Sequence, residues 1–250
     1  MIDATHRQHA SRVRLEWGPV GAEALAPVDI AVVVDVLSFT TTVTVAVERG
    51  IEVLPFLWKD ERAAAFAAEH DAVLAVQRQD ALRGGDGVSL SPVSLATAQG
   101  VRRVVLPSPN GSTVSTLLAG SGATVVAACL RNRRAVAAWL APRLTSGATM
   151  AVVPAGERWP DGSLRPAVED LWGAGAVLDA LGPADLSPEA TAAVAAFRAA
   201  GLPGALLGCS SGRELVAAGF EGDVDMAAEV DVSEVVPTLV DGMFTAAAAD

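Results

Sequence analysis

The stretch Asp29-Ile-Ala-Val-Val-Val-Asp35, followed at once by Val-Leu-Ser38-Phe-Thr40-Thr41-Thr42, decides the fold that this sequence predicts. Its apolar run is typical of a buried strand, and the hydroxyl-rich residues after Asp35 indicate the start of a helix. In open α/β sheets the carboxyl ends of strands face a crevice, and the N-terminus of the next helix offers unpaired N–H groups that suit a phosphate. An acid and an anion-binding turn so close together suggest a metal ion between them.

Outward from this stretch, short apolar runs alternate with segments of helical periodicity. Strands are expected at 30–34, 53–57, 73–76, 101–106, 125–130 and 150–153, and helices at 41–49, 59–70, 113–118, 135–140 and 168–181. This alternation predicts an α/β fold with helices on both faces of a mainly parallel sheet, with room for mixed pairing, because parallel strands need crossover connections. We expect one domain over 1–250, mainly helical from about residue 182.

Composition narrows the class of partner. The formal net charge of −11 disfavours nucleic acid as a partner, because phosphate backbones demand a basic face. No apolar stretch reaches the roughly 18 residues of a membrane span, and the N-terminus lacks a signal-peptide core. We therefore expect a cytoplasmic protein with no membrane partner, and the apolar surplus with few aromatic residues is consistent with a homodimer.

Acidic residues at strand ends and helix starts are the candidate metal ligands. They are Asp35, Glu157, Glu169 and Asp170. The helix dipole is the ordinary explanation for acids in a first turn, as at 169 and 170, but one crevice could collect all four. Such oxygen ligands suit Mg²⁺, which binds through one or two carboxylates plus substrate phosphate oxygens. With 3 histidines in the chain, a zinc site or a Ser-His-Asp triad has little support.

The candidate phosphate-binding residues lie in polar turns, most of them just before predicted helices. A capping role is the alternative for each of these turns, and for the 211–214 turn a capping box is the favoured one. The candidates are Ser38, Thr40, Thr41, Thr42, Asn110, Gly111, Ser112, Asn132 and Arg213. The glycine-rich segment 78–87 is either a lid or a surface turn.

Asp35 is interpreted as a metal ligand or base rather than a nucleophile. Haloacid-dehalogenase-type phosphatases place a second acid two residues after the nucleophile, and position 37 is Leu. The P-loop and G-x-G-x-x-G spacings are absent, which disfavours nucleotide binding.

These motifs together resemble the 2-phosphosulfolactate phosphatase family. The resemblance runs from about residue 30 to 239 and rests on the order and spacing of the motifs. They are Val-Val-Asp35-Val-Leu-Ser-Phe-Thr40-Thr41-Thr42, Pro107-Ser-Pro-Asn110-Gly111-Ser112, Ala155-Gly156-Glu157, Glu169-Asp170-Leu-Trp-Gly173 and Ser211-Gly-Arg-Glu214-Leu. The resemblance implies a three-layer α/β/α sandwich and Mg²⁺-dependent removal of phosphate from phosphoesters of 2-hydroxy acids.

Two positions depart from the family pattern. The family commonly reads Asp-Val-Leu-Arg-Ala-Thr after the first strand, whereas Ser38 and Phe39 stand here in place of Arg and Ala. The usual Gly-Glu-Arg loop is replaced by Gln77-Arg78-Gln79. A guanidinium pairs bidentately with an oxyanion, so its loss at position 38 should weaken recognition of a multiply charged substrate.

The function expected from residues and resemblance is that of a Mg²⁺-dependent phosphatase acting on a small phosphorylated 2-hydroxy acid. Asp35, Glu157 and Asn110 are the candidate catalytic residues, and the four acids are the candidate ligands of Mg²⁺. The partner is then a small anionic phosphorylated metabolite. The alternative is a catalytically degenerate family member that binds or senses such an anion without turnover.

Overall fold

The strand β2 (Ile30–Val34) is buried on both sides. All five of its side chains are shielded from solvent. In the computed structural model, which describes residues 3–57, 62–82 and 87–248, Val32 and Val34 pack into one hydrophobic cluster and Ala31 and Val33 into a second. Because successive side chains of a strand point to opposite faces, β2 is the middle layer between two layers of helices.

The other strands extend this layer in both directions. The described residues form a 9-stranded sheet in the order β1-β7-β2-β6-β10-β11-β3-β5-β4, and a separate two-stranded hairpin of β8 and β9. The remaining bounds are β1 (Val13–Leu15), β3 (Glu52–Leu57), β4 (Val73–Leu74), β5 (Arg103–Ser108), β6 (Thr124–Ala128), β7 (Met150–Pro154), β8 (Glu157–Arg158), β9 (Leu164–Arg165), β10 (Pro237–Val240) and β11 (Met243–Ala246).

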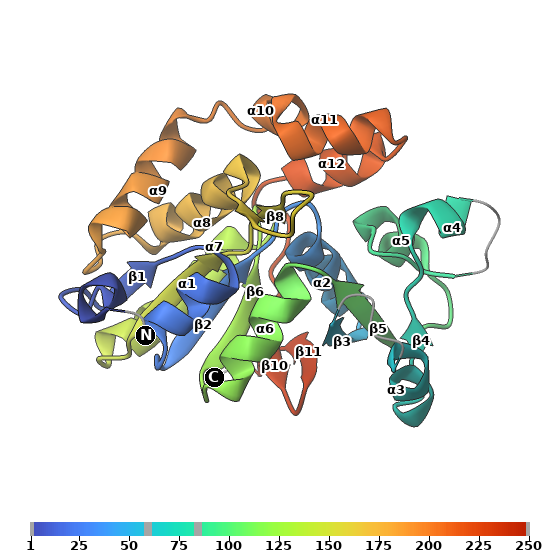
Figure 1. Cartoon of the computed structure of the whole chain (residues 1–250), viewed down its shortest axis with the longest axis horizontal. Coiled ribbons are helices and arrows are strands. Elements are labelled where there is room, and N and C mark those ends of the chain that lie inside the picture. The colour runs from blue at the N-terminus through green and yellow to red at the C-terminus, as the bar shows by residue number, and fades with distance from the viewer. Residues whose placement is uncertain (1–2, 58–61, 83–86, 249–250) are drawn as a thin grey trace.

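An antiparallel hairpin divides the sheet into two parallel halves. β1, β7, β2 and β6 pair in parallel, as do β3, β5 and β4. β10 is antiparallel to β6, and β11 is antiparallel to both β10 and β3. By these pairings the halves run in opposite senses, yet the segments that follow β2 and β5 meet, since the Gly111 N–H donates to Asp35 Oδ2 at 2.9 Å. The sheet therefore turns strongly at the hairpin (Figure 1).

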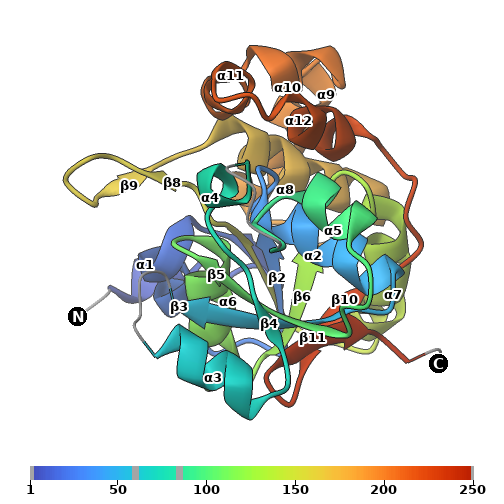
Figure 2. The ribbon, with the colours of Figure 1, turned by 90° about the vertical axis from the view of Figure 1, so that its right-hand side faces the viewer.

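Helices cover both faces and form the outer layers. Side chains of α7, α8 and α9 pack on one face, and those of α1, α2 and α6 on the other. The helices α10, α11 and α12 lie above the carboxyl ends of the central strands in both views (Figures 1 and 2). The bounds are α1 (Gly18–Leu25), α2 (Phe39–Glu48), α3 (Ala63–Glu69), α4 (Arg78–Leu82), α5 (Pro92–Thr97), α6 (Gly111–Gly120), α7 (Arg133–Thr145), α8 (Val168–Leu181), α9 (Pro188–Ala199), α10 (Gly204–Gly208), α11 (Ser210–Ala217) and α12 (Glu221–Ala228), after a 3-10 turn at Ala4–Arg7.

The expected α/β fold with a mainly parallel, partly mixed sheet and a three-layer arrangement is confirmed. The strand at 30–34 and the helix at 168–181 have their predicted bounds, and the strand expected at 101–106 lies two residues later. Part of the helix expected at 59–70 lies outside the described residues, as does part of the segment 78–87, for which a lid and a surface turn were the two interpretations. Within the described ranges, no helix combines the length and hydrophobicity that crossing a bilayer requires.

Candidate functional site

The four predicted acids lie together beyond the carboxyl ends of the central strands. Asp35 follows β2, Glu157 is the first residue of β8 after β7, and Glu169 and Asp170 occupy the first turn of α8. Their charges act on one another, because Asp35 and Glu169 both raise the pKa of Glu157 and of Asp170. The structure thus brings together acids that are far apart in sequence, up to the 135 residues between Asp35 and Asp170.

Asp35 is fixed by two backbone donors. Its Oδ1 accepts from the Phe39 N–H at 3.0 Å and its Oδ2 from the Gly111 N–H at 2.9 Å. Burial raises the pKa of Asp35 to about 6, the two N–H donors oppose that rise, and the charge of Glu169 adds to it. Gly111 is required for this approach, since a Cβ there would lie 2.3 Å from the Phe39 ring and 2.8 Å from Asp35 Oδ2.

Asp170 joins two neighbouring strand ends. Its Oδ1 accepts from the Val36 N–H at 2.7 Å and its Oδ2 from the Gly156 N–H at 2.9 Å. Its side chain is buried, and burial together with the charges of Asp35 and Glu169 raises its pKa well above the usual range. Asp170 therefore holds the turns after β2 and β7 in place beside the other acids.

Glu157 and Glu169 have oxygens left over. Asn110 Nδ2 donates to Glu157 Oε2 at 2.9 Å, and burial followed by the charges of Asp35 and Glu169 raises the pKa of Glu157 to about 8. Glu169 is 2% exposed, and its buried Oε2 has no hydrogen-bond partner in the described part of the chain. An unpaired buried carboxylate oxygen is costly unless something else compensates it.

The hydroxyl-rich turn after Asp35 uses two of its hydroxyl groups internally. Thr40 Oγ1 donates to the Asp35 carbonyl at 2.8 Å, and Thr41 Oγ1 donates to the Val36 carbonyl at 2.8 Å. Thr42 Oγ1 is buried without a hydrogen-bond partner among the described residues. The hydroxyl groups of Thr40 and Thr41 thus stabilise the turn that positions Asp35. Phosphate binding at this turn stays a prediction.

The other predicted phosphate-binding residues lie in different settings. Ser112 Oγ donates to the Leu106 carbonyl at 2.8 Å. Asn132 is fully buried, and its Nδ2 lies 3.2 to 3.3 Å from three acceptors of the protein, so its amide is committed to the fold. Arg213 is an exposed residue of α11. Asn110 and Gly111 are the members of this set that contact the acids.

Two arginines that the sequence analysis did not single out act on the acid cluster. Arg78 Nη2 donates to Ser38 Oγ, and its charge lowers the pKa of Asp35 against the effect of burial. Arg165, on β9, lowers the pKa of Glu157 in the same way. The Arg in Gln77-Arg78-Gln79 was the available signal, but only the fold places it beside Ser38, where the family pattern commonly has an Arg.

The donor set fits Mg²⁺ better than a metal that needs a closed protein cage. Within residues 3–57, 62–82 and 87–248, no three His, Cys, Asp or Glu side chains are arranged to hold an ion by themselves. Mg²⁺ keeps several waters and needs one or two carboxylates plus substrate oxygens. The orphaned Glu169 Oε2 beside three acids, two of them with pKa values raised to about 6 and about 8, is the arrangement that a cation would stabilise.

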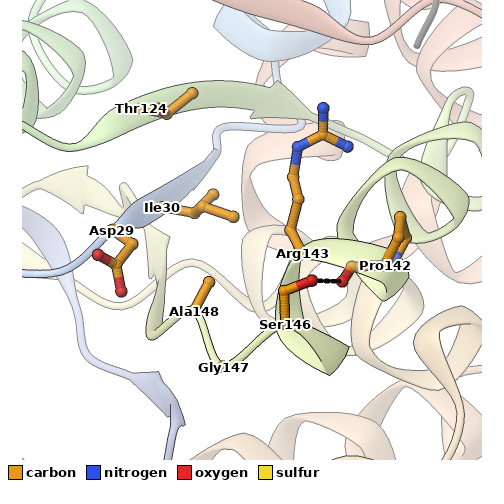
Figure 3. Close-up of a pocket in the computed structure, with 8 residues that line it drawn as sticks. All are labelled: Asp29, Ile30, Thr124, Pro142, Arg143, Ser146, Gly147 and Ala148. Carbon is orange, nitrogen blue, oxygen red and sulfur yellow. Dashed lines mark hydrogen bonds between the residues drawn. The ribbon is translucent and has the colours of Figure 1, made fainter.

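A hollow on the protein surface lies away from these acids. It is lined by Asp29, Ile30 and Thr124, at or just before the amino ends of β2 and β6, and by residues at the end of α7 (Figure 3). Asp29 there accepts from the Thr149 N–H and hydroxyl, both at 2.7 Å. The hollow therefore lies at the amino ends of the strands, opposite to the acid cluster at their carboxyl ends. Its acid, Asp29, is already hydrogen-bonded to Thr149.

Comparisons with known proteins identify the family of this chain. The family model described as 2-phosphosulpholactate phosphatase matches residues 21–242. A protein of Deinococcus radiodurans named "Probable 2-phosphosulfolactate phosphatase" is 34% identical over 221 residues, which cover 86% of this chain and 89% of the relative. A protein of Thermus thermophilus with the same name is 33% identical over 232 residues, covering 91% of this chain and 94% of the relative. The chain belongs to the 2-phosphosulfolactate phosphatase family.

Proposed function

We propose that this protein is a Mg²⁺-dependent phosphatase that hydrolyses a small phosphorylated 2-hydroxy acid. Membership of the family and the names of the two relatives support phosphatase chemistry. The observation that carries the metal dependence is Glu169 Oε2, which is buried without a partner in the described structure beside three further carboxylates. Four acids in one place repel one another, and a divalent cation would offset that repulsion.

The hydrogen-bond partners of the four acids indicate a different role for each acid. Asp35 and Glu169 are the proposed direct ligands of Mg²⁺, since Asp35 is held rigidly by two N–H donors and Glu169 has a free oxygen. Asp170, with both oxygens bonded to backbone, holds the turns and binds the ion through water. When bound, Mg²⁺ supplies charge stabilisation for the phosphoryl oxygens.

Glu157 is the proposed residue that orients the attacking water. It is the one member of the acid cluster that retains partial exposure, whereas Asp35, Glu169 and Asp170 are 6%, 2% and 3% exposed. Asn110 fixes Oε2 of Glu157 and leaves Oε1 to accept from a water molecule. Asn110 therefore acts by orienting Glu157, which contacts the reacting water.

Phosphate release from 2-phosphosulfolactate and 2-phospholactate tests this proposal, measured with Mg²⁺ and again with EDTA. We expect EDTA to abolish turnover and Asp35→Asn to lower kcat/KM by about 100-fold or more, because the variant loses a charge aimed at the metal. Asp71→Asn is the matched control, since the Asp71 side chain is 81% exposed and pairs with Arg102 elsewhere on the surface. Turnover that ignores EDTA or survives Asp35→Asn contradicts the mechanism.

The alternative function is binding of an anionic metabolite without turnover. The observation that favours it is the internal use of the Thr40 and Thr41 hydroxyls and of the Asn132 amide, which removes donors from a phosphate site. Tight binding of 2-phosphosulfolactate, measured by calorimetry in the presence of Mg²⁺, with no phosphate release would establish this second function.

A further inference from the structure

The side chain of Arg78 reaches the turn that follows Asp35. Arg78 lies in α4, its Nη2 donates to Ser38 Oγ, and its Nε donates to Asp223 Oδ2 at 3.0 Å. Ser38 itself is 3% exposed, so this contact lies inside the protein at the start of α2. A cation from a segment that is 40 residues away in sequence therefore lies beside the turn that positions Asp35.

Arg78 is held in position from several sides. Its side chain is 18% exposed, and its guanidinium carbon lies 5.7 Å from the centre of the Phe220 ring. Asp223 on α12 is 2% exposed, and its other oxygen accepts from Ser91 Oγ at 2.5 Å. Because Asp223 is itself fixed, it determines where the guanidinium points.

The guanidinium keeps donors that the described residues do not use. An arginine has five N–H groups in a planar fork, and here Nε and Nη2 each have a partner. Nη1 makes no hydrogen bond to any residue in the ranges 3–57, 62–82 and 87–248. A partly buried, immobile fork with free donors is suited to a planar oxyanion, which it can bind through two parallel hydrogen bonds.

We propose that Arg78 binds the carboxylate of the phosphorylated 2-hydroxy acid and that Asp223 is the positioning residue for Arg78. The proposal rests on the proposed function, because it names the residue that recognises the acid end of that substrate. In a 2-hydroxy acid the carboxylate is one carbon away from the ester oxygen, so a group beside the metal-binding acids must receive it.

The phosphoryl group is the less suitable partner for Arg78. The phosphoryl oxygens must reach the acids that hold the cation, and Arg78 contacts Ser38 rather than any of those acids. Arg78 therefore lies beside the acid cluster, at the turn by which Asp35 leads into α2. That offset matches a substrate in which one carbon carries both the phosphate ester oxygen and the carboxylate.

Two substrates that differ only in the acid group test the role of Arg78. 2-Phospholactate carries the carboxylate, and isopropyl phosphate replaces it with a methyl group. We expect Arg78→Met to lower kcat/KM for 2-phospholactate by about 30-fold, mainly through KM, and to change kcat/KM for isopropyl phosphate by less than about 3-fold. Arg102→Met is the control, because Arg102 is an 80% exposed arginine that also pairs with an aspartate.

Two further variants separate recognition from a structural role. Arg78→Lys keeps the charge but not the fork, and we expect it to restore part of the loss. Asp223→Asn should raise KM for 2-phospholactate while leaving kcat and the isopropyl phosphate reaction nearly unchanged. Millimolar guanidinium added to Arg78→Ala should restore turnover of 2-phospholactate selectively. An equal loss on both substrates, or no loss on either, would overturn the proposal.

If the protein is not a phosphatase, the result differs from the result expected if Arg78 does not bind the carboxylate. If the wild-type protein releases phosphate from neither substrate, calorimetry with Mg²⁺ and the same two compounds replaces the kinetic assay. Preference for 2-phospholactate that disappears in Arg78→Met would then support the role of Arg78 without catalysis. Binding with no preference between the two compounds, or no binding of either one, would overturn it.

Discussion

Gly111 brings two chain segments into a contact that no side chain at this position would allow. Its N–H reaches Asp35 because the Phe39 ring and Asp35 Oδ2 fill the space where a Cβ would stand. At Gly120, at the other end of the same helix, no neighbouring atom lies within 4 Å of the place where a Cβ would stand. The two glycines of α6 therefore have different reasons to be glycine.

Gly111→Ala should lower the free energy of unfolding by about 1–3 kcal/mol, since the added methyl must displace the ring or the carboxylate. Gly120→Ala should instead leave stability unchanged or raise it by up to about 1 kcal/mol. Urea unfolding followed by circular dichroism measures both. Equal effects of the two substitutions would show that the close approach at Gly111 is not tight.

The convergence of the four acids was predictable from sequence, but the directions of other side chains were not. Asp35, Glu157, Glu169 and Asp170 converge because strand ends and helix starts share one edge of the sheet. The inward hydrogen bonds of Thr40 and Thr41 depend on local geometry that a sequence pattern does not contain. Arg78 was missed as a site residue because its partners are 40 and 145 residues away in sequence.

The hairpin β10–β11 is the element that joins the halves of the sheet. Phe244 on β11 is fully buried, pairs with Val53 of β3, and meets the Phe39 ring edge-on with centroids 6.1 Å apart. Phe39 in turn lies against the position of Gly111. Through the contact between Phe244 and Phe39, the hairpin therefore packs against the turn that follows Asp35.

Phe244→Ala should lower the free energy of unfolding by about 3–5 kcal/mol, because it empties a core position between β3 and α2. Val240→Ala is the matched control on the same hairpin, and its effect should stay within about 0.5 kcal/mol because Val240 is 52% exposed. Chemical unfolding of both variants gives the comparison. A small effect of Phe244→Ala would mean that the hairpin is not part of the cooperative core.

Elements with strong local patterns were predicted, and this hairpin was not. The strand at 30–34 and the helix at 168–181 are long or strongly apolar, so their bounds follow from the sequence. The last fifty residues were expected to be mainly helical, yet 237–240 and 243–246 are strands of the central sheet. A signal was present in Asp241-Gly242, which have φ values of 49° and 80° and link the paired residues Val240 and Met243. Such a two-residue Asp-Gly connection is typical of a hairpin.

At the scale of the whole molecule, the acid cluster couples stability to pH. Burial raises the pKa of Asp35 from 3.8 to about 6 and that of Glu157 from 4.5 to about 8. Between the unfolded and folded values, the folded protein holds protons that the unfolded chain has released. The free energy of unfolding therefore falls as pH rises through this window.

With respect to these groups, we expect the metal-free protein to be most stable below about pH 4, under the unfolded pKa values of 3.8 and 4.5, and to lose stability from there up to about pH 8. Each unit of raised pKa corresponds to at most ~1.4 kcal/mol, and partial solvent access of Glu157 reduces the effect. Urea unfolding in EDTA at several pH values measures the slope, and Glu157→Gln should flatten its upper part. Mg²⁺ should stabilise the protein more at pH 8 than at pH 5. Stability that rises with pH across this window in EDTA would contradict the assignment.

The position of the hairpin in the sheet also has a consequence for synthesis on the ribosome. β2, β3, β5 and β6 are all made before residue 130, yet the strands that lie between β6 and β3 are made after residue 236. Each parallel half can form early, but the pairing that joins them waits for the last strands to emerge. One continuous sheet can therefore hold the acids and Gly111 in place only after residues 237–246 have left the ribosome, long after β2 and β5 have been made.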